Sequence, residues 1–182
     1  MPAAAVVLGS LSRSGAPAPG GGRATSMRIE IFTLLAALAL AIPLETGAFE
    51  LTAEERAALV RGEQVVRPLA SAGRGDRYGG TALVLIDAPV ERVEAAIEDL
   101  AAYPEMFPMV VSARLVGRRA GLEVVQMRQG TRVFSLVYHM AVHRVPERHI
   151  IRFCLVPALP HDIEDVAGFW RLFPQDGGRT LV

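Results

Sequence analysis

The sequence has one cysteine, no net charge and few aromatic residues. Because Cys154 has no second cysteine to pair with, a disulfide framework and a cysteine-based zinc site within one chain are excluded. The formal charge is +0 at pH 7, and arginines alternate with acidic residues along the chain. Binding to nucleic acid needs a surplus of basic residues on one face, so no nucleic-acid partner is expected.

Motifs for several kinds of chemistry are also missing. No glycine-rich loop follows a predicted strand and opens a helix, and no serine lies in a Gly-x-Ser-x-Gly turn. His139 and His143 lie four residues apart on one predicted strand, and the polar run His161–Asp165 follows later. In a strand these two imidazoles would be about 13 Å apart, too far to ligate one ion. We therefore expect no metal site and no cofactor.

The first 48 residues differ in composition from the rest. Residues 1–26 are rich in Ala, Gly, Pro and Ser, which predicts a disordered extension or a segment that precedes the true start at Met27. Residues 27–48 then have a short basic start, an apolar run from Ile31 to Leu44 and small residues at 46–48. This pattern is typical of a secretory signal peptide. The sequence thus predicts export to a bacterial periplasm, and the alternative is a membrane anchor formed by the same segment.

Residues 49–80 predict a lead-in to the main domain. Thr52 and Glu55 form a capping-box pair at the start of a short helix, and Gly62 is a natural end for it. Val65 to Leu69 has the composition of an edge strand, and Ser71 to Gly80 is a glycine-rich loop.

Residues 81–182 predict an α+β domain. A β-prone run from Thr81 is followed by a helical pattern that begins at Asp87, whose side chain is expected to cap the helix. Several strand-like runs separated by short turns come next, which favours an antiparallel meander.

The run from Arg132 to Val145 is longer than a typical strand, at roughly 45 Å if fully extended. Such a strand must bend in a small domain, so the sheet is expected to be strongly curved. Its residues alternate, and one face is more apolar because it carries Phe134, Leu136, Tyr138, Met140 and Val142. A concave apolar face needs a cover, either a helix or a ligand.

The order of these elements resembles the START-like helix-grip superfamily, which includes polyketide cyclases/dehydrases and coenzyme Q-binding proteins. The resemblance rests on "LVLIDAPVERVEAAIEDLAAYPEMFPMVVSARLV" (Leu83 to Val116) and "DVAGFWRLFPQDGGRTLV" (Asp165 to Val182). It implies two short helices after the first strand, closing one end of a curved antiparallel sheet. The long C-terminal helix of that superfamily is missing from the sequence. We interpret the chain as truncated, and the alternative is a groove that a partner covers.

The resemblance also gives a purpose to the apolar connection between the predicted helix and the next strand. Pro104 fits the first turn of a second short helix, and Pro108 would end it. The side chains between them would then form the rim of a cavity for an apolar ligand, although plain core packing explains each one singly. The predicted pocket residues are Tyr103, Met106, Phe107, Phe134, Leu136, Tyr138, Met140, Phe153, Leu155 and Trp170.

The function implied is binding, sequestration or transport of a hydrophobic small molecule, a lipid or an isoprenoid quinone, with transient membrane contact. One alternative is a polyketide cyclase/dehydrase-type enzyme with acid–base groups inside the pocket. Its weak candidates are Tyr138 and Arg128, while His139 and Asp165 are further polar groups within apolar strands. The alternation places Tyr138 on the apolar face and His139 in solvent. Another alternative is a protein-interaction module with an open hydrophobic groove.

Overall fold

The computed structural model describes residues 8–10, 50–68, 79–119, 121–131 and 133–182. The signal peptide predicted for residues 27–48 and most of the predicted extension, 1–26, lie outside these ranges. Within that extension, Leu8–Ser10 forms a short strand, β1. Among the described residues, no helix has both the length and the apolar character needed to cross a bilayer.

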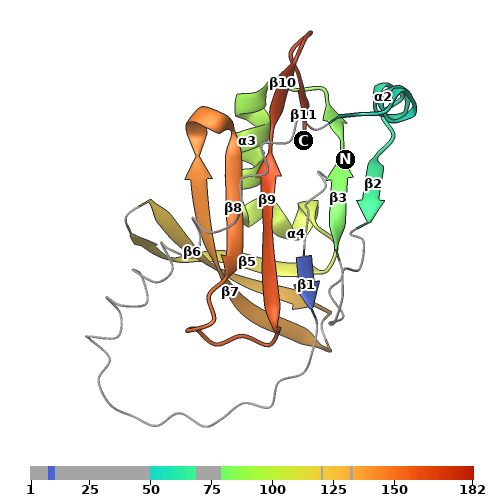
Figure 1. Ribbon diagram of the computed structural model, residues 1–182. Coiled ribbons are helices and arrows are strands. Elements are labelled where there is room, and N and C mark those ends of the chain that lie inside the picture. The colour runs from blue at the N-terminus through green and yellow to red at the C-terminus, as the bar shows by residue number, and fades with distance from the viewer. Residues whose placement is uncertain (1–7, 11–49, 69–78, 120, 132) are drawn as a thin grey trace, which may run out of the picture.

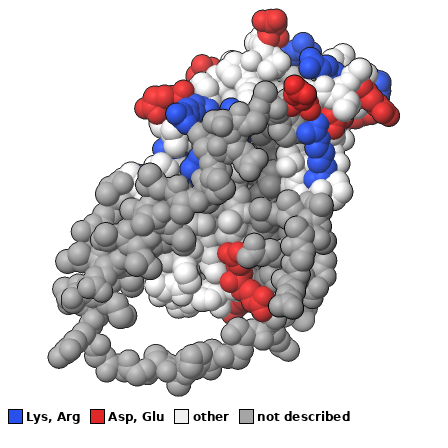
Figure 2. Space-filling view, viewed as in Figure 1, with Lys and Arg blue, Asp and Glu red and all other residues white. Residues whose placement is uncertain are grey.

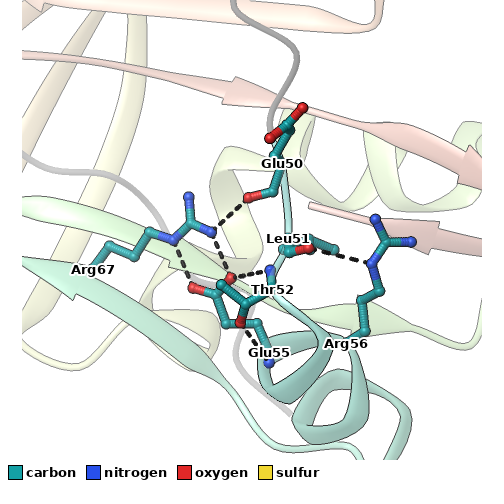
Figure 3. Close-up of polar contacts among 6 residues, drawn as sticks. All are labelled: Glu50, Leu51, Thr52, Glu55, Arg56 and Arg67. Atoms are coloured by element: carbon teal, nitrogen blue, oxygen red, sulfur yellow. Dashed lines mark hydrogen bonds and ion pairs between the residues drawn. The ribbon is translucent and has the colours of Figure 1, made fainter.

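The lead-in unit consists of α2 (Ala53–Val60) and β2 (Val65–Pro68), which pairs antiparallel with β3 (Gly80–Leu83). The predicted capping box is present, because the Thr52 hydroxyl accepts from the Glu55 N–H and the Glu55 carboxylate accepts from the Thr52 N–H. Arg67 on β2 donates two hydrogen bonds to the same carboxylate, at 2.7 and 2.6 Å (Figure 3). One carboxylate therefore joins the helix start to the strand.

The main sheet has six strands in the order β1-β9-β8-β7-β6-β5, with every neighbouring pair antiparallel. Its long strands are β5 (Val110–Arg119), β6 (Leu122–Gly130), β7 (Ser135–Val145), β8 (Ile150–Leu155) and β9 (Asp165–Arg171). Strands β5 and β6 cross the direction of β8 and β9 steeply (Figure 1). Irregularities in β5 next to Ser112 and Gly117 contribute to this bend, because a bulge increases local twist. The predicted curved antiparallel sheet is confirmed.

A second sheet continues from the first. It contains β10 (Phe173–Gln175), β11 (Arg179–Leu181) and β4 (Leu85–Ile86), in that order. Only Leu172 separates β9 from β10, so the chain passes directly from one sheet into the other.

Helical segments between β4 and β5 pack on the concave side of the main sheet. They are α3 (Val90–Glu98), the 3-10 turn η1 (Leu100–Ala102) and the one-turn helix α4 (Tyr103–Met106). The two predicted short helices are therefore present, and Pro104 lies in the first turn of α4 as expected. The prediction that Asp87 caps α3 is wrong, because Pro89 occupies the cap position and no side chain bonds there.

The convex side of the sheet is partly covered by residues 156–164, which connect β8 to β9. Asp162 exchanges two hydrogen bonds with Val137 of β7, at 2.9 and 2.7 Å. The Nδ1–H of His139 donates to the Pro160 carbonyl at 2.9 Å, and its Nε2 accepts from Gln126 at 3.1 Å. His139 is therefore 8% exposed, and the prediction that it is solvated is wrong.

Candidate ligand-binding cavity

A cavity of about 330 Å³ lies between the concave face of the main sheet, α4 and β3. Its wall is predominantly apolar and draws on the lead-in unit, the helical connection and five strands of the main sheet. It is lined by Gln64, Ala82, Tyr103, Phe107, Pro108, Val110, Met127, Gln129, Tyr138, Met140, Val142, Ile151, Phe153, Val166 and Trp170.

Strand register brings the sheet side of the wall together. Alternation along β7 sends Tyr138, Met140 and Val142 into the cavity, since residues two apart share a face. Across the strands, Met127 of β6 is opposite Tyr138 and Phe153 of β8 is opposite Val142. These rows form one continuous surface, because directly opposed residues on neighbouring strands point the same way.

The helical connection forms the opposite wall. Tyr103 and Phe107, four residues apart, have their rings edge to face at 4.9 Å between centroids. Phe107 also lies 5.9 Å from the ring of Trp170 on β9. The Tyr103 hydroxyl donates to the Ile97 carbonyl at 2.8 Å, which holds α4 against the end of α3. The apolar connection is therefore an aromatic cover over one side of the cavity.

Two phenols are the titratable groups in the described wall. Burial raises the pKa of Tyr138 to about 12, and its hydroxyl donates to Gln129 Oε1 at 2.9 Å. Burial also raises the pKa of Tyr103 to about 12, although Arg144 opposes this shift. Both phenols are therefore neutral hydrogen-bond donors near neutral pH, and neither can act there as a base.

Six of the ten predicted pocket residues line the cavity: Tyr103, Phe107, Tyr138, Met140, Phe153 and Trp170. Leu136 and Leu155 pack in the adjoining core, and Met106 is half-buried outside the lining. Phe134 is largely exposed beyond the end of β7. The inward direction of Phe153 and Trp170 could not be read from the sequence, because it depends on the register between strands. That these residues bind a ligand stays a prediction.

The weak catalytic candidates do not converge on the cavity. Arg128 is exposed and donates from Nε to the Ser135 hydroxyl at 3.0 Å. Asp165 is exposed at the start of β9, and His139 lies on the convex side of the sheet. Only Tyr138 among these candidates reaches the cavity wall.

Several wall residues were missed by sequence reasoning. Met127 and Gln129 alternate on β6 as the β7 residues do, so the same period-two pattern could have identified them. Val166 shares a face of β9 with Trp170, four positions away. Gln64 and Ala82 carry no such signal, because the lead-in unit reaches the cavity only through its tertiary packing.

An ion-pair network lies beside the cavity, on the same concave face of the sheet. Arg144 of β7 contacts Glu98 of α3 at 2.6 Å and also contacts the buried Glu123 of β6. Arg118 contacts the other oxygen of Glu123 at 2.6 Å. Burial alone would raise the pKa of Glu123, but hydrogen bonds from Arg144 and Arg118 outweigh it and lower the pKa. Glu123 is therefore charged, and α3 is tied to the sheet.

A curved antiparallel sheet with short helices over its concave face and an apolar cavity between them defines a helix-grip, START-like domain. Residues 80–182, more than half of the chain, match the family described as polyketide cyclase / dehydrase and lipid transport. The chain belongs to this family. No curated protein matches it in sequence.

Several solved structures have a similar arrangement. The Zhui aromatase/cyclase from Streptomyces sp. R1128 is 20% identical with a TM-score of 0.47, over 54% of this chain and 59% of that one. A protein from Thermus thermophilus is 22% identical with a TM-score of 0.47, over 54% and 66%. A STAR-related lipid transfer protein from Xanthomonas axonopodis is 20% identical with a TM-score of 0.42, over 56% and 64%. The chain thus spans about three fifths of the length of these proteins.

Proposed function

We propose that this domain binds and carries a hydrophobic small molecule, a lipid or an isoprenoid quinone, in the cavity under α4. The observation that carries the proposal is the character of the wall. Its described side chains are apolar or uncharged, and burial moves the pKa of its two phenols further from neutral pH. Such a wall favours retention of an apolar guest over acid–base chemistry on it.

The size of the cavity indicates what part of a ligand it encloses. Ligand pockets commonly span roughly 300–1,000 Å³, so a cavity of about 330 Å³ suits a ring or a short segment of chain. The remainder of a long ligand would leave past Gln64 and Pro108, lining residues that are exposed. Each Å² of apolar ligand surface removed from water contributes roughly 25 cal/mol before the costs of ordering.

A polar pair in the wall suits a ligand with one carbonyl or hydroxyl group. Gln129 accepts from Tyr138 through its carbonyl oxygen, which directs its amide nitrogen to other partners. A carbonyl on the ligand is one such partner, and an amide donor matches it well. A quinone ring or the polar end of a lipid meets this requirement.

Trp170 provides a direct test, because it is the only tryptophan in the sequence and it lines the cavity. Protein purified without detergent would be extracted and its contents identified by mass spectrometry. Stripped protein would then be titrated with a short-chain quinone and with a fatty acid while Trp170 fluorescence is followed. We expect a saturable change for at least one ligand.

The outcomes separate the candidate functions. A co-purifying lipid or quinone together with a Trp170 response supports carriage. An empty protein that turns over a polyketone would instead support a cyclase, and Tyr138 would then be its first candidate residue. A stable complex with a second protein chain and no response to any apolar ligand would support an interaction module.

A further inference from the structure

Three apolar side chains protrude together beside the cavity. Met109, Val133 and Phe134 are 61%, 97% and 58% exposed, and we call them the apolar tip. Met109 precedes β5, and the other two lie in the turn between β6 and β7. The two segments meet because the Gly130 N–H donates to the Met109 carbonyl at 2.7 Å.

Hydrogen bonds among the described residues brace the turn that carries Val133 and Phe134. The Thr131 hydroxyl accepts from the Val133 N–H at 3.3 Å and from the Phe134 N–H at 3.2 Å. The Thr131 N–H donates to the Phe134 carbonyl at 2.6 Å. Gly130 has φ +136°, and a Cβ there would lie 2.2 Å from that carbonyl oxygen. The backbone therefore holds these two side chains outward.

Met109 is held outward at a conformational cost. Its φ of +70° is in the left-handed region, which residues with a Cβ other than Asn and Asp seldom adopt. Asn or Gly would relieve that strain, and a polar side chain would remove an exposed apolar one. Core packing does not explain the methionine, because most of its surface is in water.

The apolar tip is continuous with the mouth of the cavity. Pro108 and Val110, the neighbours of Met109, both line the cavity. On the other segment, Phe134, Leu136 and Tyr138 follow at alternate positions, from exposed through half-buried to buried in the wall. An apolar path therefore runs from the apolar tip into the cavity.

We propose that the apolar tip inserts into the interfacial region of a lipid bilayer and places the cavity mouth against it. Three side chains on two turns are too small for a stable protein interface, which buries about 800 Å² on each partner. Insertion into a bilayer needs only a few protruding apolar side chains, because the lipid acyl chains rearrange around them. The docking stands by itself, and the passage of a ligand from bilayer to cavity rests on the proposed function.

Charges near the apolar tip are mixed in sign. Arg128, on β6 beside the turn, is exposed, and Arg132 directly precedes Val133 in the sequence. Asp162 bonds to Val137 a short distance along β7. Among the described atoms of the visible face, Figure 2 shows basic and acidic side chains together along the upper part and an acidic group in the lower part. The attraction is therefore expected to be apolar, with little dependence on ionic strength, in contrast to a basic membrane-binding patch.

The first test measures partitioning of the full chain onto phosphatidylcholine vesicles at low and high salt. The apolar-tip variant combines Met109→Asn, Val133→Ser and Phe134→Ser, which suit the left-handed position and keep the turn's backbone bonds. A matched control, Val60→Ser, Val116→Ser and Phe169→Ser, removes three exposed apolar side chains elsewhere. We expect the partitioning of the apolar-tip variant to fall by about tenfold or more, with the control unchanged.

A second test locates the contact, whatever the predicted segment 27–48 does in the same chain. Cys154 is buried, so Val133→Cys can be labelled selectively with an environment-sensitive fluorophore. Val116→Cys, exposed on β5, serves as the control position. With vesicles that carry bromine on their acyl chains, we expect a blue shift and quenching at position 133 and neither at position 116.

Three results would overturn the docking proposal. They are equal partitioning of the apolar-tip and control variants, a label at position 133 that stays in water on bound vesicles, and apolar-tip-dependent dimers in the absence of lipid. If docking is found but Trp170 responds to no ligand, the docking stands and the carrier function fails. The two ideas therefore fail independently.

Discussion

A single carboxylate, that of Glu55, joins the start of α2 to β2 in the lead-in unit. It accepts from the Thr52 backbone at the start of α2 and from the Arg67 guanidinium on β2 (Figure 3). The Arg67 hydrogen bond, and then the one from Thr52, lower the pKa of Glu55 from 4.5 to about 2. Arg67 also donates to the Glu50 carbonyl at 2.9 Å, so the start of the described domain is bound into the same cluster.

This lowered pKa predicts an acid-sensitive attachment. Because the folded form prefers the ionised carboxylate, the stabilisation is fully present above pH 4.5 and is lost as the pH falls towards 2. The protection factors of α2 amides, which correct hydrogen exchange for its intrinsic pH dependence, should fall over that range while those in β7 stay high. In Glu55→Gln this pH dependence should disappear, whereas Glu54→Gln on the same turn should keep it. Identical profiles for all three proteins would contradict the assignment.

Removal of the Tyr138 hydroxyl tests whether this group takes part in ligand binding. In Tyr138→Phe, Gln129 loses the group that bonds its carbonyl oxygen, which should cost about 1 kcal/mol of stability. A carrier should still bind an apolar ligand, as followed by Trp170 fluorescence, because the phenyl ring keeps the wall intact. Tyr103→Phe is the matched control, since its hydroxyl bonds to the Ile97 carbonyl instead. A loss of ligand binding in Tyr138→Phe alone would show that the hydroxyl recognises the ligand.

At the scale of elements, Arg144 joins α3 to the sheet through Glu98 and Glu123. In Arg144→Met the buried Glu123 would keep only the bond from Arg118. The free energy of unfolding, measured with urea, should therefore fall by about 1–3 kcal/mol. Glu98→Gln should cost about 1 kcal/mol or less, because that carboxylate is more exposed.

The same variant should also change the response to acid. In the natural chain the lowered pKa of Glu123 means that its stabilisation is lost as the pH falls below 4.5. Without Arg144, burial acts against a weaker opposing bond and should raise that pKa, so Arg144→Met should lose less stability on acidification. Parallel urea midpoints against pH for the two proteins would contradict this role.

The strands and helices could be predicted from the sequence more fully than the residues that pack around them. Alternation along β7 identified the face that carries Tyr138 and Met140, because period-two patterns depend only on the strand itself. It could not reveal that residues 156–164 cover the other face and bury His139. Phe134 and Leu155 both belong to apolar runs of the sequence. In the structure Phe134 lies just before β7 and Leu155 packs in the adjoining core. Both positions depend on how the strands pair. The sequence therefore predicted the curved sheet, and six of the ten residues predicted for the pocket line the cavity.

For the whole molecule, a ligand in the cavity should raise thermal stability, since it binds the folded state and not the unfolded one. At a free concentration about a hundredfold above Kd, the melting temperature should rise by roughly 5–15 °C. Scanning calorimetry of stripped and reloaded protein would measure this. A melting temperature that no apolar compound changes would argue against an enclosed guest.

Export is a separate prediction for the whole chain, made from residues 27–48. If that segment is a cleaved signal peptide, N-terminal sequencing of protein from the periplasm should begin near Phe49. Recovery of the apolar run Ile31–Leu44 in the membrane fraction would favour the anchor instead. Neither outcome affects the cavity, whose described walls all lie after residue 63.

The pairing of β4 with β11 joins two strands that are synthesised at widely separated times. Leu85 pairs with Leu181, and the Thr180 hydroxyl donates to the Ala88 carbonyl at 2.8 Å. At a synthesis rate of about 5–20 residues per second, the partner of β4 leaves the ribosome roughly 5–20 s after β4 itself. During that interval β4 lacks the strand that it pairs with in the described part of the chain, so its backbone N–H and C=O groups remain open to other partners.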